Sequence, residues 1–258
     1  MTTVLVIILL NMVKGTPYNT TYSTNFTSYD ASYWTLEDEC AHCGGSGHGD
    51  ECTFMTPSAI VYNSSGATIT TTRFETDFKC INKSNTSTPC KSGHMLFNPM
   101  LLYGTVTVRA RWFPGTQNNV NTSTGFIGLD SPTNIGSITF GFHGKGWLGH
   151  DKGADDFSHE FQTALYSNVT DPHNREYIKT PDTDLADDFN IFQTIWHPDK
   201  VEWTLNGKTV RKVTNVSIIP NLEMNLKLHT RSGYCHTMPV DDSFYAQITY
   251  FEYTPYNP

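Results

Sequence analysis

The chain has 258 residues, 13% of them aromatic and 16% charged, and a formal net charge of −8. This acidic balance argues against a nucleic-acid partner, which would require a basic surface stripe. The length suits one all-β domain with a large core, and we expect no membrane span, because the most apolar run is too short to cross a bilayer.

Residues 1–15 are predicted to form a signal peptide. The apolar run from Val4 to Leu10 matches the hydrophobic region of such a peptide, and Val13-Lys14-Gly15 offers a small-residue cleavage site. A basic segment before the run is missing apart from the amino terminus, so a buried N-terminal strand is the alternative. A signal peptide predicts a secreted, extracellular protein of a cell wall, surface coat or filament.

Residues 16–52 are expected to form an N-terminal arm and a cysteine-rich loop. The segment 16–33 is rich in Thr, Ser, Tyr and Asn and is predicted to be an extended arm or an outer strand, which could dock onto a neighbouring molecule. Gly, Cys and His dominate residues 40–52. We therefore place the main domain at residues 53–258.

The cysteine content predicts three disulfides, because an even number of cysteines is typical of secreted proteins. The six cysteines are Cys40, Cys43, Cys52, Cys80, Cys90 and Cys235. Cys80 and Cys90 bracket a polar loop and are expected to close it, and one of the first three cysteines is expected to reach Cys235. The alternative is a zinc site made by the first three cysteines and His48. An oxidising compartment favours disulfides, so we expect no metal or cofactor.

Eight Asn-x-Ser/Thr sequons mark acceptor sites for N-glycosylation. They begin at Asn19, Asn25, Asn63, Asn82, Asn85, Asn121, Asn168 and Asn215. Most of them lie in polar, turn-rich stretches that should be exposed. We therefore expect a heavily glycosylated protein of a eukaryotic secretory pathway.

The remaining sequence alternates with the period of two that is typical of half-buried strands. In 103–112, Val106, Val108 and Ala110 share one face, and polar side chains share the other. Similar strands are expected at 67–73, 222–228 and 245–253, and a hairpin at 201–210 turns at Asn206-Gly207. Many short strands without helical periodicity predict an all-β fold, a two-sheet antiparallel β-sandwich or jelly roll.

Residues 136–144 form a strand with two different faces. The small or polar face holds Ser137, Thr139, Gly141 and His143, and the apolar face holds Ile138, Phe140 and Phe142. The apolar face is predicted to pack in the core. The opposite face is predicted to form the floor of an open groove on a concave sheet.

Five stretches, in this order, resemble glycoside hydrolase family 16, the β-glucanases and transglycosylases built on a two-sheet jelly roll. They are residues 103–111, 124–132, 188–196, 198–203 and 206–208. Phe161-Gln-Thr163, followed by Asn174-Arg-Glu176, is similar to the fungal cell-wall branch that joins chitin to glucan. The resemblance extends from about residue 50 to the end and implies the fold of the family, but not its function.

The same resemblance implies that the catalytic acids are missing. The family carries Glu-x-Asp-x-Glu on one strand, and here Ser137 falls at the nucleophile, Thr139 at the assisting Asp and Gly141 at the acid/base Glu. A retaining mechanism needs two carboxyl groups about 5 Å apart. Glu160 is a weak substitute, because Asp156 and Glu160 imitate the family spacing but are expected in a loop and at the edge of the groove.

We therefore expect a catalytically inactive extracellular glycoprotein. It either binds a β-glucan-type polysaccharide or is a structural subunit that assembles with copies of itself or other extracellular glycoproteins. The alternative is an active glycosidase or transglycosylase on β-glucan or chitin with relocated acids. Trp147 and His143 are the candidate carbohydrate contacts, because sugar rings stack on indole. Trp34 and Trp112 are further candidates, although Trp112 is expected in the core.

Overall fold

The computed structural model describes residues 17–41, 53–79, 87–112, 123–133, 135–143, 159–167, 174–232, 235 and 238–258. Within these ranges the chain is mostly β-structure, and η1 (Pro57–Ala59) is a turn of 3₁₀ helix. The strands are β1 (Tyr22–Thr24), β2 (Trp34–Leu36), β3 (Glu39–Ala41), β4 (Thr53–Met55), β5 (Ile60–Asn63), β6 (Gly66–Lys79), β7 (Ser87–Ser92), β8 (His94–Phe97), β9 (Gly104–Arg111), β10 (Ser123–Asp130), β11 (Gly136–His143), β12 (Glu160–Ser167), β13 (Arg175–Lys179), β14 (Asn190–His197), β15 (Lys200–Leu205), β16 (Lys208–Val213), β17 (Asn225–Ser232) and β18 (Ser243–Pro255).

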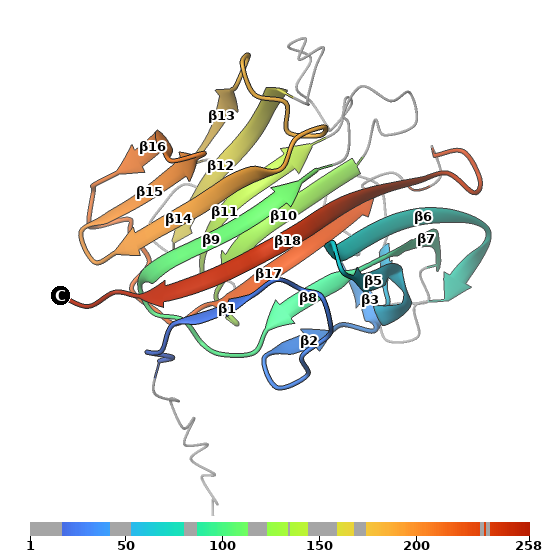
Figure 1. Cartoon of the computed structure of the whole chain (residues 1–258), viewed down its shortest axis with the longest axis horizontal. Coiled ribbons are helices and arrows are strands. Elements are labelled where there is room, and N and C mark those ends of the chain that lie inside the picture. The colour runs from blue at the N-terminus through green and yellow to red at the C-terminus, as the bar shows by residue number, and fades with distance from the viewer. Residues whose placement is uncertain are drawn as a thin grey trace, which may run out of the picture.

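The strands form two sheets, which lie one behind the other in Figure 1. The first sheet has the order β16-β15-β14-β9-β18-β6-β7-β4-β3, with β1 added to β18 and β5 added to β6. The second has the order β13-β12-β11-β10-β17-β8-β2. Neighbouring strands are antiparallel except for the pair of β4 and β7. The predicted two-sheet jelly roll is confirmed. None of the described residues forms a helix that is long and apolar enough to span a membrane.

The hydrophobic core lies between the two sheets and follows the alternation of the sequence. Val106, Val108 and Ala110 of β9 are buried, whereas Arg109 between them is exposed. The predicted hairpin is also confirmed: Asn206 and Gly207 join β15 to β16 with φ values of 50° and 77°. Positive φ at both central residues is the requirement of a type I′ turn, whose twist matches that of the paired strands.

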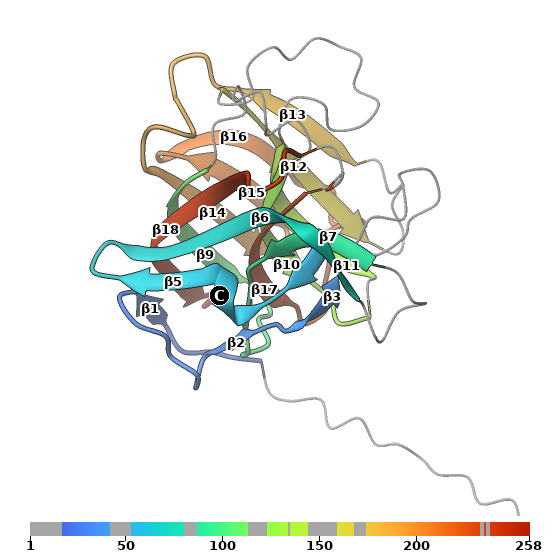
Figure 2. The same ribbon diagram turned by 90° about the vertical axis from the view of Figure 1, so that its right-hand side faces the viewer.

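The described part of the expected N-terminal arm packs on this chain. β1 pairs with β18 of the first sheet and β2 pairs with β8 of the second, so both lie near one edge of the sandwich (Figures 1 and 2). Tyr22 stacks on Tyr33 with ring centres 4.1 Å apart. Trp34 and Trp112 are buried in the core. They are therefore not available as surface platforms for a sugar.

The disulfide between Cys90 and Cys235 corrects two expectations. Cys90 lies on β7 of the first sheet and Cys235 follows β17 of the second, with Cα atoms 5.6 Å apart. The expected Cys80–Cys90 bond is thus wrong, and so is a bond from Cys235 to one of the first three cysteines. The inner face of β7 meets β17 directly, since the Ser92 hydroxyl donates to the Thr230 carbonyl at 2.5 Å. The two cysteines pair because β7 and β17 face each other across the sandwich, although they are far apart in the sequence.

Among the other four cysteines, Cys40 is described and is also disulfide-bonded. It is therefore removed from the zinc alternative. Cys43, Cys52 and Cys80 lie outside the described residues, as do residues 1–15.

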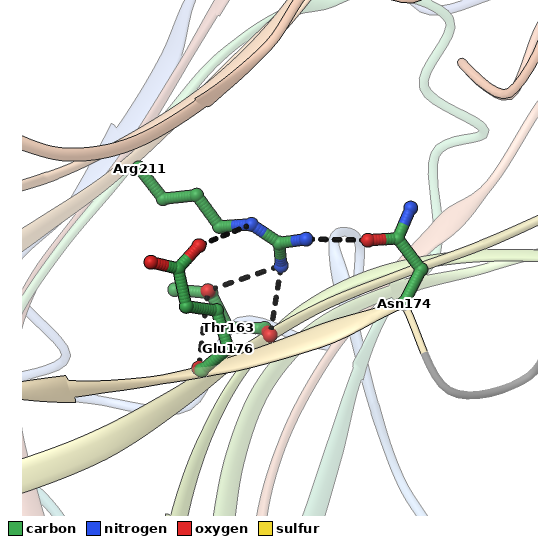
Figure 3. A network of polar contacts seen from close by, with 4 residues as sticks. All are labelled: Thr163, Asn174, Glu176 and Arg211. Atoms are coloured by element: carbon green, nitrogen blue, oxygen red, sulfur yellow. Dashed lines mark hydrogen bonds and ion pairs between the residues drawn. The ribbon is translucent and has the colours of Figure 1, made fainter.

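Arg211 joins the two sheets along their open edge, where β16 ends the first sheet and β13 ends the second (Figure 3). Its Nε lies 3.2 Å from Glu176 Oε2, one terminal nitrogen donates to the Thr163 carbonyl at 2.9 Å, and the other donates to Asn174 Oδ1 at 2.5 Å. The guanidinium also lies 5.0 Å from the Trp203 ring centre. The side chain is only 8% exposed. This one residue therefore satisfies polar groups on two strands of the opposite sheet.

We predict that Arg211→Ala lowers the free energy of unfolding by about 2–3 kcal/mol, because charged hydrogen bonds at a buried edge are lost. Arg211→Lys should recover part of this loss at most, since an ammonium cannot reproduce the planar fork. Urea unfolding measures both effects. The exposed neighbour provides the control, and Lys212→Ala should change stability by less than about 0.5 kcal/mol. Equal stability of the Arg211 and Lys212 variants would contradict the role of this network.

Candidate functional site

Strand β11 lies inside the second sheet, between β10 and β12. Ile138, Phe140 and Phe142 are at most 3% exposed and belong to the core. Ser137 and Thr139 lie on the opposite face and are partly exposed. The predicted division of the two faces is confirmed. At residues 137–141, the outer face of β11 therefore carries only short side chains.

The strands on either side place one residue beside each of the three small positions. Phe126 and Gln162 flank Gly141, Gly128 and Ala164 flank Thr139, and Asp130 and Tyr166 flank Ser137. Directly paired residues of antiparallel strands point to the same face. Tyr177 of β13 extends the first of these rows, because it pairs with Gln162. Short hydroxyl side chains are thus bordered by three aromatic rings.

Asp130 is the carboxylate that sequence reasoning missed. A Cβ atom placed on Gly128 would lie 3.7 Å from Asp130 Oδ2 and 3.3 Å from Thr139 Cγ2, so this carboxyl group lies over the glycine. Lys227 Nζ lies 3.7 Å from the same oxygen. Burial raises the pKa of Asp130, and the nearby charges of Lys227 and His94 oppose that rise. The sequence does indicate that Asp130 points outward, because it follows Leu129, which points into the core. No sequence motif, however, marks Asp130 as a functional residue.

A buried histidine pair continues the outer face away from β11. The rings of His94 and His229 lie 4.9 Å apart, and both residues are at most 5% exposed. His94 Nδ1 lies 2.5 Å from Glu37 Oε2. The His229 ring lies 5.0 Å from Phe126, and the Arg231 guanidinium lies 5.4 Å from the same phenyl ring. Burial lowers the pKa of Arg231 to about 10. These groups hold the Phe126 ring from one side.

The other predicted site residues either lie farther from Ser137, Thr139 and Gly141 or fall outside the described residues. Glu160 begins β12 and pairs with Lys179, two residues beyond the partner of Gly141. It therefore lies outside the three rows that contain Ser137, Thr139 and Gly141. The His143 side chain, Trp147 and Asp156 lie outside the described residues.

Four of the predicted glycosylation sites can be located. Asn19, Asn25, Asn63 and Asn215 are all exposed, as a modified asparagine requires. The sequons at Asn82, Asn85, Asn121 and Asn168 lie outside the described residues. Among the described residues, no group of three or more His, Cys, Asp or Glu side chains is arranged to hold a metal ion.

The comparisons with known proteins agree with the architecture. The family described as "Glycosyl hydrolases family 16" matches residues 50–237. None of the curated proteins matches the sequence. Solved structures match over most of the chain. Their sequence identities to it are so low that they show a shared fold and nothing more.

Three of these structures show how similar the matched proteins are in sequence and in fold. A "native glycosidic hydrolase" is 20% identical, with a TM-score of 0.69, and the match covers 94% of this chain and 99% of that one. The β-glucanase of Bacillus licheniformis is 16% identical, with a TM-score of 0.65 and coverage of 92% and 98%. A Crh5 transglycosylase is also 16% identical, with a TM-score of 0.60 and coverage of 92% and 85%.

The raised pKa of Asp130 predicts a defined pH dependence. Because the native state holds this proton more tightly than the unfolded chain does, the contribution to stability is largest below the ordinary carboxyl pKa and is lost as pH rises through the raised one. The stability of the wild type relative to Asp130→Asn should therefore fall as pH rises above about 4 and then level off. Urea unfolding of both proteins across this range measures the difference. A difference that grows with pH would show that pairing with Lys227 outweighs burial.

Proposed function

Because the chain belongs to glycosyl hydrolase family 16, we propose that it binds a β-glucan-type polysaccharide on the outer face of the second sheet and does not cleave it. The observation that carries this proposal is the identity of the three central residues of β11. Ser137 and Thr139 are partly exposed on that face, Gly141 is buried between Phe126 and Gln162, and we match these three residues to the positions where the family pattern places its acids.

The chemistry of these three side chains supports the loss of cleavage. A retaining glycosidase needs one carboxylate to attack the sugar and one carboxylic acid to protonate the leaving oxygen. The hydroxyls of Ser137 and Thr139 are not ionised near neutral pH, and Gly141 has no side chain. Asp130 supplies one carboxyl group beside these positions, and one group cannot perform both roles in the same step.

The borders of the same face support binding. Phe126, Tyr166 and Tyr177 stand on three different strands around the short side chains. Aromatic rings offer apolar faces to the C–H groups of a sugar, and the hydroxyls of Ser137 and Thr139 offer hydrogen bonds without a charge to desolvate. The solved relatives named as β-glucanases are the reason for proposing a β-glucan. We also propose Trp147 as a contact, from its place four residues after β11.

A second candidate function is a glycosidase or transglycosylase with a relocated acid. The observation in its favour is Asp130, whose carboxyl group is partly buried and has a raised pKa. The carboxyl groups that donate protons in glycosidases also have raised pKa values. This candidate still requires a nucleophile. Glu160 stands outside the rows of the site, so it does not supply one at the position that the family uses.

Secretion belongs to the same proposal. The buried disulfide and the exposed sequon asparagines fit an oxidising compartment with N-glycosylation. Polysaccharide of a wall or coat is a ligand that such a protein would meet.

We predict that Tyr166→Ala and Tyr177→Ala each weaken binding of a soluble β-glucan about fivefold, because loss of stacking costs about 1 kcal/mol. Tyr166→Phe and Tyr177→Phe keep the ring and should retain most of the affinity. Affinity electrophoresis or calorimetry measures the change. Tyr245 lies on the other sheet and is 45% exposed, which makes Tyr245→Ala the matched control. Absence of binding by the wild type, or an equal loss in the control, would contradict the proposal.

A further inference from the structure

A pocket of about 630 Å³ lies on the outer face of the first sheet, the sheet that does not contain β11. Arg109 and Arg111 of β9 and Thr249 and Gln247 of β18 form part of its lining, Phe189 and Ser65 form another part, and the sequon residue Asn25 lines it as well. This volume is in the range of sites that hold small organic ligands, about 300–1,000 Å³. It is therefore larger than a site for a single inorganic ion.

The two arginines are brought together by Phe189. Arg109 and Arg111 are two residues apart on one strand, so they point to the same face. Their guanidinium carbons lie 4.6 Å and 5.2 Å from the centre of the Phe189 ring. A guanidinium group is attracted to the face of an aromatic ring. Because this contact does not use the N–H groups of the guanidinium, they stay available for hydrogen bonds. The ring thus holds two like charges side by side.

The backbone of β18 is adapted to this pair. The register between β18 and β9 shifts between Ile248 and Tyr250, which leaves Thr249 as an extra residue opposite Arg109. Such a bulge redirects a side chain. The Thr249 hydroxyl accepts a hydrogen bond from Arg109 at 2.9 Å, and Gln247 Oε1 accepts one from Arg111 Nε at 3.1 Å. A guanidinium has five N–H groups, so both arginines keep donors for a ligand.

The turn between β5 and β6 closes one side of the pocket. Gly66 has a φ of 112°, and a Cβ atom at this position would lie 2.3 Å from the Ile248 carbonyl oxygen. Only glycine allows the turn to approach the bulge this closely. Gln247 Nε2 then donates to the Ser65 carbonyl at 3.4 Å. The glutamine therefore bridges the turn and Arg111.

The charge of the pocket specifies its ligand. Within the described parts of the chain, no carboxylate lies within ion-pair distance of Arg109 or Arg111, and none lines the pocket. Two neighbouring guanidinium groups without an acid repel each other, and a bound anion would relieve this repulsion. Planar guanidinium groups match the oxygens of carboxylate and sulfate in a bidentate manner. The chain as a whole has a formal charge of −8, so this positive site is local.

We propose that this pocket is a second ligand site, which binds the oxyanion of an acidic sugar. The oxyanion is a carboxylate or a sulfate, which share the chemistry that the arginines recognise. Thr249 and Gln247 lie beside the arginines, and the second N–H of the Gln247 amide, which its bond to Ser65 does not use, can donate to a sugar hydroxyl. The site is independent of the β-glucan face, because it belongs to the other sheet.

Calorimetric titration of the full chain, produced without N-glycans because Asn25 lines the pocket, tests this site at low salt with three probes: glucuronate, glucose 6-sulfate and neutral glucose. We expect one or both acidic probes to bind with a dissociation constant of about 1 mM or tighter, and glucose to bind at least tenfold more weakly, as expected for charge-assisted hydrogen bonds. Added sodium chloride should weaken the binding. The acid that binds more tightly identifies the source of the oxyanion.

Variants of the arginines complete the test. Arg109→Gln and Arg111→Gln should each weaken binding about tenfold, and Arg111→Lys should weaken it as well, because a lysine keeps the charge but loses the fork. Lys208→Gln removes an exposed charge from β16 and should leave binding unchanged. Circular dichroism checks that each variant is folded. Failure of both acids to bind, glucose binding as tightly, or an equal loss in the Lys208 variant would overturn the proposal.

Discussion

The packing of two phenyl rings between the sheets determines which face of β11 points outward. Phe142 stacks on Trp112 with ring centres 4.1 Å apart, and Phe140 meets Phe192 edge-on at 5.5 Å. A slip of one residue would turn both phenyl rings to solvent, at a cost of about 1.5–3 kcal/mol each. The short side chains of β11 are therefore held on the outer face, and the neighbouring strands position every other group around them.

The two outer faces of the sandwich have different chemistry. Around β11, hydroxyl groups lie between aromatic rings, which suits a neutral sugar chain. On the first sheet, Arg109 and Arg111 form a positive pocket that suits an acidic ligand. Because a strand exposes alternate residues to each face, each sheet can acquire its own surface without disturbing the core. One jelly roll can thus present two separate ligand surfaces.

Local patterns in the sequence predicted the strands, the Asn206-Gly207 turn and the faces of β11, because each depends on neighbours within a few residues. Contacts between distant segments were not predictable in the same way. Cys90 pairs with a cysteine 145 residues away, and the salt bridge from Arg211 to Glu176 crosses from one sheet to the other. Asp130 was missed for the same reason, since its place beside Ser137 depends on the register of two strands.

The most direct test of a binding site without catalysis is incubation of the purified full chain with β-1,3-1,4-glucan and with chitin oligomers. Reducing ends and transfer products are then measured over time, with a β-glucanase as the positive control. The wild-type protein should produce neither, because Ser137 and Gly141, which we propose stand at the positions of the nucleophile and the proton donor, carry no carboxyl group. Sustained formation of new ends would contradict this account, and its loss in Asp130→Asn or Glu160→Gln would identify the acid that had taken over.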